Sequence, residues 1–281
     1  MSVAVAQGWL AGTGRSVKEW RRAALDNADG IKHSRMPPVW VSVTLILFHF
    51  SLIGLCVRCT RDLSLTGLAV ASILLYSCAF TAATITLLCS CRHFQVSREA
   101  LGIRASTMRS DLRWSLRICA LGVFAITVTI VIGFVAVLCA GVRLPAPPAS
   151  YVQVLGGDWT DPRFLAIAGL GGGIATVVAP VTEELIYRSL FLPPLTYRLG
   201  LYPAIIVTSL VFGLAHVLPF GQIRIPLPEI VGGLLMAAGF AIRWSIVPAI
   251  VIHAMGNMVA GTLALIYVRF FMAHPTVFAN P

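Results

Sequence analysis

The chain has 281 residues, of which 58% are hydrophobic and only 11% are charged, and its mean hydropathy is +0.87. Because soluble domains carry about 25% charged residues, this composition excludes an ordinary soluble domain and predicts an all-α, polytopic integral membrane protein. The formal net charge of +10 would suggest a nucleic-acid partner for a soluble protein. In a membrane protein it is expected from basic loops on one side of the bilayer, so no nucleic-acid partner is expected.

Apolar runs separated by polar segments follow one another along the chain, and about 20 residues suffice for a helix to cross a ~30 Å hydrocarbon core. One further stretch is apolar but interrupted, at 181–199. We therefore expect about seven transmembrane helices, with six to eight as the range. The runs lie at 39–57, 66–89, 118–142, 164–180, 202–218, 229–242 and 246–272.

Lysine and arginine residues favour one orientation of these segments. Six precede the first apolar run and six more lie at 92–117, whereas the alternate loops hold only Arg58 and Arg61, then Arg143 and Arg163. Because positively charged loops stay on the cytosolic side of a membrane, we expect the N-terminus to lie in the cytosol.

Composition also divides the chain into regions, because a Pro- and Gly-rich loop separates ordinary apolar runs from runs that contain ionisable residues. We expect five regions. They are a basic cytosolic N-terminal tail at 1–38, a three-helix transmembrane scaffold at 39–142, the loop at 143–163, a functional transmembrane core at 164–272 and a C-terminal tail at 273–281.

Two adjacent carboxylates, Glu183 and Glu184, lie in the apolar sequence ATVVAPVTEELIYRSLFLPPL. A charged side chain at the bilayer centre costs roughly 2.5–3.5 kcal/mol, so an intramembrane carboxylate indicates function. On a helix, Glu184 and Arg188 are i, i+4 neighbours and can form an ion pair. Glu183 is rotated about 100° away and stays available as a base. A purely structural ion pair is the alternative, but it leaves Glu183 unexplained.

Two further motifs place polar side chains one helical turn apart. They are Phe212-x-x-x-His216, in LVFGLAHVLPF, and His253-x-x-x-Asn257, in IVIHAMGNMVAG, where Gly256 and Gly261 are expected to allow close helix packing. An amide donor beside an imidazole suits an oxyanion hole. Taken alone, either motif could equally be a hydrogen-bonded packing feature.

Together, the base, the two imidazoles and the amide match the needs of peptide hydrolysis. Glu183 would deprotonate a water molecule held with His216, and that water would attack the scissile carbonyl. His253 and Asn257 would stabilise the tetrahedral oxyanion, and one of the histidines would pass a proton to the leaving amine.

The motif order EExxxR, FxxxH, HxxxN resembles the CAAX-processing and bacteriocin-processing (CPBP, or Abi) family of intramembrane proteases. Within it, APVTEELIYRSLFLPPL and FGLAHVLPF are most similar to the type II CAAX prenyl endopeptidase. Many bacterial members have Gly where this chain has Ser189, which favours the prenyl branch. The resemblance covers residues 175–260 and implies a CPBP-like catalytic core at 164–272, whereas 1–160 match no motif.

The resemblance implies removal of the last three residues from prenylated CaaX proteins, such as small GTPases. It implies the same catalytic residues as the hydrolysis scheme above, with the same roles: Glu183, His216, His253 and Asn257. It adds three supporting residues, Glu184, Arg188 and Phe212. The lipid on such a substrate concentrates it in the membrane, at about 0.8 kcal/mol per buried CH₂. The resemblance implies the endoplasmic reticulum membrane, and a bacterial plasma membrane is the alternative.

No cofactor is favoured, but Glu183, His216 and His253 could bind zinc with an open fourth position, in which case Glu184 becomes a candidate base. The main alternative function is a proton- or ion-coupled membrane transporter, in which intramembrane Glu and His residues form a relay. Such a relay usually extends through several spans, whereas the first three spans here offer little beyond His49. A bis-His haem protein and a catalytically silent scaffold are further alternatives.

Overall fold

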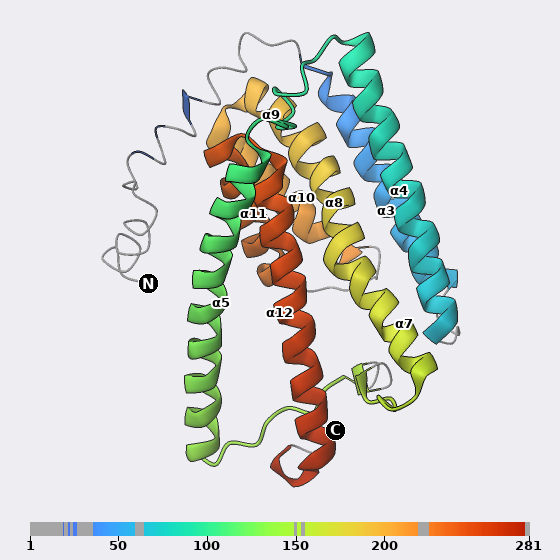
Figure 1. The fold of residues 1–281 in the computed structure, drawn as a ribbon, viewed down its shortest axis with the longest axis vertical. Helices are drawn as coiled ribbons and strands as arrows, with labels where there is room; N and C mark the ends of the chain where they lie inside the picture. The colour runs from blue at the N-terminus through green and yellow to red at the C-terminus, as the bar shows by residue number, and fades with distance from the viewer. Residues whose placement is uncertain are drawn as a thin grey trace.

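The computed structural model of the chain is a bundle of helices (Figure 1). It describes residues 36–59, 65–148, 151–152, 155–218 and 225–278, with the isolated positions 19, 22, 25 and 26. Most of the tail at 1–38 lies outside the described residues, so its cytosolic location stays a prediction. Within the described part, five helical segments are long and apolar enough to cross a membrane, which confirms the all-α, polytopic class. They are Val39–Cys56, Val70–His93, Met108–Val137, Pro162–Leu199 and Ile246–Ala273.

The long helices form two flanks and a centre. Helices α3 (Val39–Cys59) and α4 (Leu65–His93) pack side by side on one flank, and α5 (Met108–Cys139) forms the other (Figure 1). Helix α12 (Ile246–Ala273) packs against α5 and, on its other side, against the central helical segment Pro162–Leu199.

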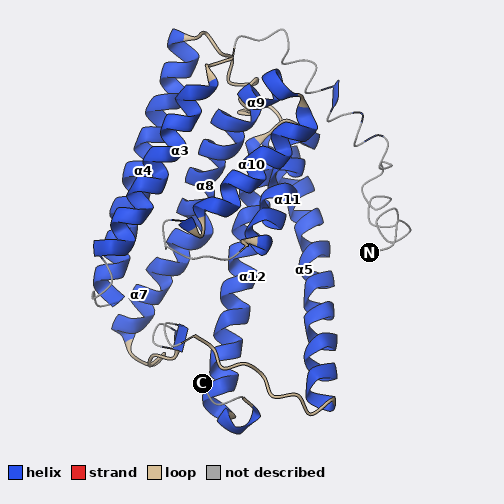
Figure 2. Ribbon diagram, turned by 180° about the vertical axis from the view of Figure 1, so that it is seen from behind, coloured by secondary structure: helices blue, strands red, loops and turns tan. Residues whose placement is uncertain are grey.

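Two of the seven expected segments are short helices that are not among the five long ones. Helix α10 (Leu201–Ala215) has 15 residues and α11 (Leu227–Arg243) has 17. At 1.5 Å per residue they are about 22 and 26 Å long, less than the ~30 Å hydrocarbon core. The two helices pack against each other beside α12, between the two flanks of the bundle (Figure 2).

The runs at 164–180 and 181–199 are one continuous helical segment rather than two membrane segments. Its prolines do not end it. Each proline lacks an N–H, and its ring clashes with the carbonyl four residues earlier. A wider π-helical stretch precedes Pro180 and another precedes Pro193 and Pro194, which relieves that clash. The pieces are α7 (Pro162–Gly173), η2 (Ile174–Val178), α8 (Ala179–Glu184), η3 (Leu185–Phe191) and α9 (Leu192–Leu199).

Glycines bring α10 and α11 into close contact. A Cβ atom on Gly213 would lie 2.6 Å from Ile230 Cγ1, and one on Gly233 would lie 3.1 Å from Ser209 Cα. The expectation that Gly256 and Gly261 allow close helix packing is wrong, because a Cβ at either position would meet nothing within 4 Å. Close packing in this core therefore depends on the short helices and not on the glycine of the HxxxN motif.

The buried core lies toward one end of the bundle, where α3, η3, α9, α10 and α11 meet the segment at 94–107. That segment is anchored to the turn between α11 and α12: Trp244 Nε1 donates to Ala100 O at 3.0 Å, and Ile246 N donates to Gly102 O at 2.9 Å. By contrast, α7 at the far end has no buried residue. The polar residues of the candidate site lie at the edge of this core.

Candidate active site

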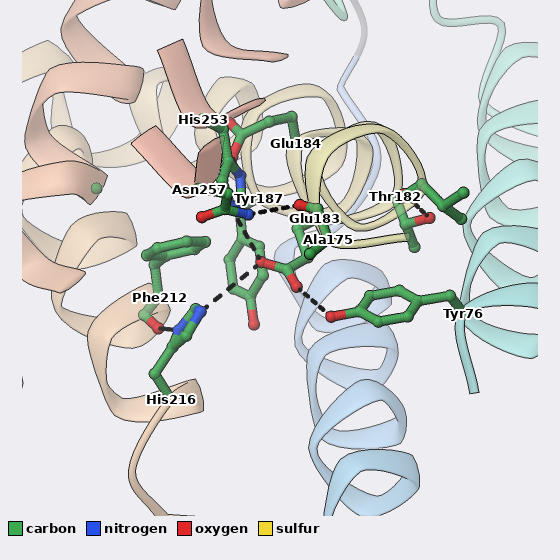
Figure 3. A network of polar contacts seen from close by, with 12 residues as sticks. Tyr76, Ala175, Thr182, Glu183, Glu184, Tyr187, Phe212, His216, His253 and Asn257 are labelled. Carbon is green, nitrogen blue, oxygen red and sulfur yellow. Dashed lines mark hydrogen bonds and ion pairs between the residues drawn. The ribbon is translucent and has the colours of Figure 1, made fainter. Parts of the chain in front are cut away.

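The two carboxylates occupy the last turn of α8, between the two π-helical stretches. Glu183 is 4% exposed and Glu184 is fully buried, although both lie in a segment long enough to cross a membrane. π-Helical turns are rare and are frequent at functional sites, because the extra residue redirects side chains. The local geometry sends the two carboxylates in different directions, so that they approach His253 from different sides (Figure 3).

Glu184 and Arg188 form the expected ion pair, with Arg188 Nε 3.1 Å from Glu184 Oε2 and both side chains fully buried. The contact is a close charge pair rather than a well-aligned hydrogen bond, since neither atom meets hydrogen-bond geometry within the described part of the chain. Arg188 also donates from Nη2 to Gly233 O on α11 at 3.1 Å. Its guanidinium carbon lies 4.8 Å from the centre of the Phe212 ring, within cation–π range.

The second carboxylate oxygen of Glu184 reaches α12. Glu184 Oε1 lies 2.9 Å from His253 Nδ1, and His253 is buried. A carboxylate accepts hydrogen bonds, so Nδ1 carries the hydrogen, and Nε2 is directed away from Glu184. Glu184 therefore bridges the arginine of its own helix and a histidine of another, and it orients the imidazole.

Glu183 faces both histidines. Its Oε2 atom lies 4.0 Å from Nε2 of His216 and 3.9 Å from Nε2 of His253. His216 follows the last residue of α10, where its Nδ1 lies 2.9 Å from Phe212 O. Because a carbonyl oxygen only accepts, His216 also carries its hydrogen on Nδ1. The His216 side chain is 35% exposed, so one side of the cluster is open.

Three acceptor atoms therefore converge: a carboxylate oxygen and, in the neutral imidazoles, two lone-pair nitrogens. Glu183 Oε2 has no hydrogen-bond partner among the described residues. A water molecule, which has two donor hydrogens, matches this set of acceptors, and a protonated imidazole would also supply a donor. The arrangement suits a base that removes a proton from water.

The same atoms fit zinc in kind but not in spacing. Two ligands of a tetrahedral zinc ion with bonds of ~2.0–2.1 Å lie about 3.4 Å apart. The separations of 4.0 and 3.9 Å from Glu183 Oε2 are wider than this. In the part of the chain that the structure describes, no group of three or more His, Cys, Asp or Glu side chains is arranged as a metal site.

Asn257 lies one turn after His253 on α12, as the HxxxN spacing predicts. Its Nδ2 donates to the carbonyl oxygen of Ala175, in η2, at 2.7 Å. An amide nitrogen carries two hydrogens, so this bond fixes the side chain and leaves the second hydrogen available. Figure 3 shows Asn257 beside His253, on the same side of the two carboxylates.

The Phe212 ring holds the cluster together. Its centroid lies 4.6 Å from that of His216, 5.5 Å from that of His253 and 5.3 Å from that of Tyr187. These edge and tilted contacts add apolar packing around the imidazoles. The structure thus brings the expected residues Glu183, Glu184, Arg188, Phe212, His216, His253 and Asn257 into one region.

Sequence reasoning noted His49 but placed neither it nor Tyr76 in the site, to which they are added by α3 and α4. The Tyr76 hydroxyl, on α4, donates to Glu183 Oε1 at 3.0 Å. His49, on α3, is 1% exposed, and its Nδ1 lies 3.5 Å from the Tyr187 hydroxyl. A polar group in the middle of an apolar span was the available signal, but nothing in the sequence indicates which helix it faces.

Comparison with known proteins supports the same region. Residues 166–259 match the family described as type II CAAX prenyl endopeptidase Rce1-like. Over 79 residues the chain is 37% identical to proteins named CAAX prenyl protease 2 from Homo sapiens and Rattus norvegicus. The aligned part is 28% of this chain and spans only 20% of the human protein and 22% of the rat protein. No solved structure matches the chain.

The matched residues include both carboxylates, both histidines and Asn257, but neither Tyr76 nor His49. The match extends from within α7 to the middle of α12, so it covers the stretches of helix on which those residues lie. The resemblance carried by the three motifs is therefore confirmed: residues 166–259 are similar to the Rce1-like type II CAAX prenyl endopeptidase family.

Proposed function

We propose that this protein is an intramembrane endopeptidase that removes the C-terminal tripeptide from prenylated CaaX proteins, with Glu183 as the base that activates water. One observation carries the proposal. A buried carboxylate oxygen lies within 4.0 Å of two imidazole nitrogens, inside a segment that matches the Rce1-like family. A structural ion pair explains Glu184 and Arg188 but not this second cluster of acceptors.

In the first step, a water molecule between Glu183 and His216 loses a proton to Glu183 Oε2. The resulting hydroxide attacks the carbonyl carbon of the scissile peptide bond and forms a tetrahedral intermediate. His216 lies on the open side of the cluster, 35% exposed, where it can hold this water and meet the substrate. Burial of Glu183 keeps competing solvent away from the base.

In the second step, the oxyanion is stabilised and the amine leaves. His253 is held at Nδ1 by Glu184, and in its charged form it directs an Nε2–H toward the region beside Glu183. The second Nδ2 hydrogen of Asn257 completes the pair of donors. The carbon–nitrogen bond then breaks, and the proton taken by Glu183 passes through His216 to the leaving amine. The products are a new C-terminal carboxylate and a tripeptide with a free amino group.

The position of the site in a membrane suits a substrate with a lipid anchor. Each buried CH₂ of a prenyl chain contributes about 0.8 kcal/mol of membrane affinity, so such a substrate is concentrated in the bilayer that contains the enzyme. Small GTPases with CaaX ends are the expected substrates, and the endoplasmic reticulum is the expected membrane. The mammalian relatives support this location, and the basic segment at 92–117 supports a cytosolic N-terminus.

The test is cleavage of a farnesylated CaaX peptide by membranes that contain the full chain. We expect the parent to release the tripeptide and Glu183→Gln to lose activity, with Glu183→Ala as a second loss variant. Glu184→Ala is expected to lower activity as well, through the released His253. Glu99→Gln removes the same charge from an exposed carboxylate in the segment at 94–107 and is expected to cleave normally. Full cleavage by folded Glu183→Gln would overturn the proposal.

A chelator added to the same assay tests the role of metal. The donor types at Glu183, His216 and His253 suit zinc, although their spacing is wide for it. Cleavage that survives prolonged chelation supports water activation by Glu183 alone. Loss of cleavage that zinc restores would replace it with a metal mechanism.

A further inference from the structure

Helix α4 lies outside the segment that matches the family, yet it contributes a side chain to the site. The Tyr76 hydroxyl donates a hydrogen bond to Glu183 Oε1 at 3.0 Å (Figure 3). The hydrogen bond joins a flanking helix to the central helical segment. It can form because α4 packs along α7, η2, α8 and η3. The chemistry proposed above does not use this contact.

The location of Tyr76 is unusual for a tyrosine in a membrane helix. Tyrosine side chains are enriched at the two membrane–water interfaces, where the hydroxyl reaches polar groups. Tyr76 instead lies within the apolar span Val70–His93, away from its ends. Tyr76 is half-buried, and the hydrogen-bond partner of its hydroxyl is the carboxylate of Glu183.

The hydrogen bond gives the two oxygens of Glu183 different surroundings. Oε1 is held by Tyr76 on one side, and Oε2 faces the nitrogens of His216 and His253 on the other. The terminal torsion of a glutamate is broad and roughly two-fold, so without an anchor the carboxylate rotates freely between orientations. The anchored oxygen fixes the plane of the group and keeps Oε2 directed at the site.

The packing of α4 makes Tyr76 a firm anchor. Ala79 and Ala83, three and seven residues later, are fully buried and lie on the same face of the helix. Small side chains at these positions let helix backbones approach closely, which is the usual basis of tight packing in membranes. The tyrosine therefore extends from a helix face that is held against its neighbours.

We propose that Tyr76 is a positioning residue that orients the base Glu183 through its hydrogen bond to Oε1. This inference rests on the proposed function and extends the site beyond the family-matched segment to α4. Tyr76 touches neither the water nor the scissile bond, so it acts on the rate of the chemical step and not on substrate binding.

The first test compares Tyr76→Phe with Tyr267→Phe in the farnesylated-peptide assay. Both variants remove one hydroxyl that donates a hydrogen bond, since Tyr267 donates to Pro145 O at 2.6 Å. We expect Tyr76→Phe to lower kcat by about tenfold or more while KM changes less than roughly twofold. Tyr267→Phe is expected to leave both values unchanged. A kcat for Tyr76→Phe equal to that of the parent would overturn the inference while leaving the proposed function intact.

The second test does not depend on cleavage. Glutamate labelled with ¹³C at the carboxyl carbon gives a resonance for Glu183, identified by its loss in Glu183→Gln. We expect this resonance to move in Tyr76→Phe and to stay in place in Tyr267→Phe. An unmoved resonance in Tyr76→Phe would overturn the inference even if the parent fails to cleave a farnesylated peptide, which is the result that counts against the proposed function.

Discussion

Replacing Arg188 with methionine tests whether the buried charges form one connected unit. Methionine keeps most of the volume of the side chain and removes its charge. The change deletes the ion pair to Glu184, the hydrogen bond to Gly233 O and the cation–π contact with Phe212. Among the described residues, Glu184 then keeps only His253 as a polar side-chain partner.

The expected cost follows from the geometry. Two unit charges at the observed 3.1 Å attract each other by about 5 kcal/mol at an effective dielectric constant of 20. Removing one member of a buried pair costs about 3–5 kcal/mol, because the remaining charge stays desolvated. For a chain of this size, such a loss lowers the melting temperature by roughly 6–20 °C.

The assay is thermal unfolding of the purified full chain in detergent, with Arg198→Met as the matched control, because Arg198 is an exposed arginine on α9. A double-mutant cycle with Glu184→Gln isolates the pair, since the glutamine oxygen can still accept from His253 Nδ1. We expect the double variant to be more stable than the sum of the two single losses implies. Losses that simply add, or an unchanged melting temperature in Arg188→Met, would refute the reasoning.

Two further predictions concern the helices around this pair. Gly233→Ala places a Cβ 3.1 Å from Ser209 Cα and is expected to cost about 1–3 kcal/mol in thermal unfolding, whereas Gly256→Ala meets no atom within 4 Å and should be neutral or slightly stabilising. A Gly233→Ala variant as stable as Gly256→Ala would contradict the close packing of α10 on α11. Asn257→Ala is expected to lower kcat by about 10²–10³-fold and to shift the melting temperature only slightly, since it removes a proposed oxyanion donor. A kcat within threefold of the parent would remove Asn257 from the proposed site.

Local periodicity was enough to predict the contacts within one helix. The i, i+4 spacing of Glu184 and Arg188 gave an ion pair that the structure contains, and Phe212 and His216 lie one turn apart in ring contact. Helix geometry fixes such pairs whatever the rest of the fold does. Hydropathy likewise predicted the membrane class, because the bilayer imposes its thickness on every spanning helix.

Contacts between helices were not available from the same patterns. Nothing in the sequence around Glu184 points to His253, and nothing around Tyr76 points to Glu183, because the pairs lie 69 and 107 residues apart. The number of membrane segments expected from hydropathy, about seven, also differs from the five long apolar helices of the described residues, for a related reason. Hydropathy registers apolar residues but not where a helix ends, as in the short helices α10 and α11, nor whether a helix continues past its prolines through π-helical turns.

The arrangement of charges explains how two adjacent carboxylates are tolerated in an apolar segment. Each one has a partner on another helix: Glu184 contacts His253 on α12, and Glu183 contacts Tyr76 on α4. Arg188 extends the set to α11 through Gly233. The polar cluster therefore connects several helices of the bundle through these contacts.

Substitutions of the two carboxylates should consequently affect stability and activity differently. Loss of the Glu184 carboxylate leaves Arg188 as an uncompensated buried charge, so it should weaken the fold and the site together. In the described part of the chain, the ion pairs of Glu183 are those with the two histidines at about 4 Å, so its neutralisation should remove activity while sparing the fold. We expect Glu183→Gln to melt at the same temperature as the parent and Glu184→Gln to melt at a lower one. That result would assign the base and the structural anchor to two neighbouring residues.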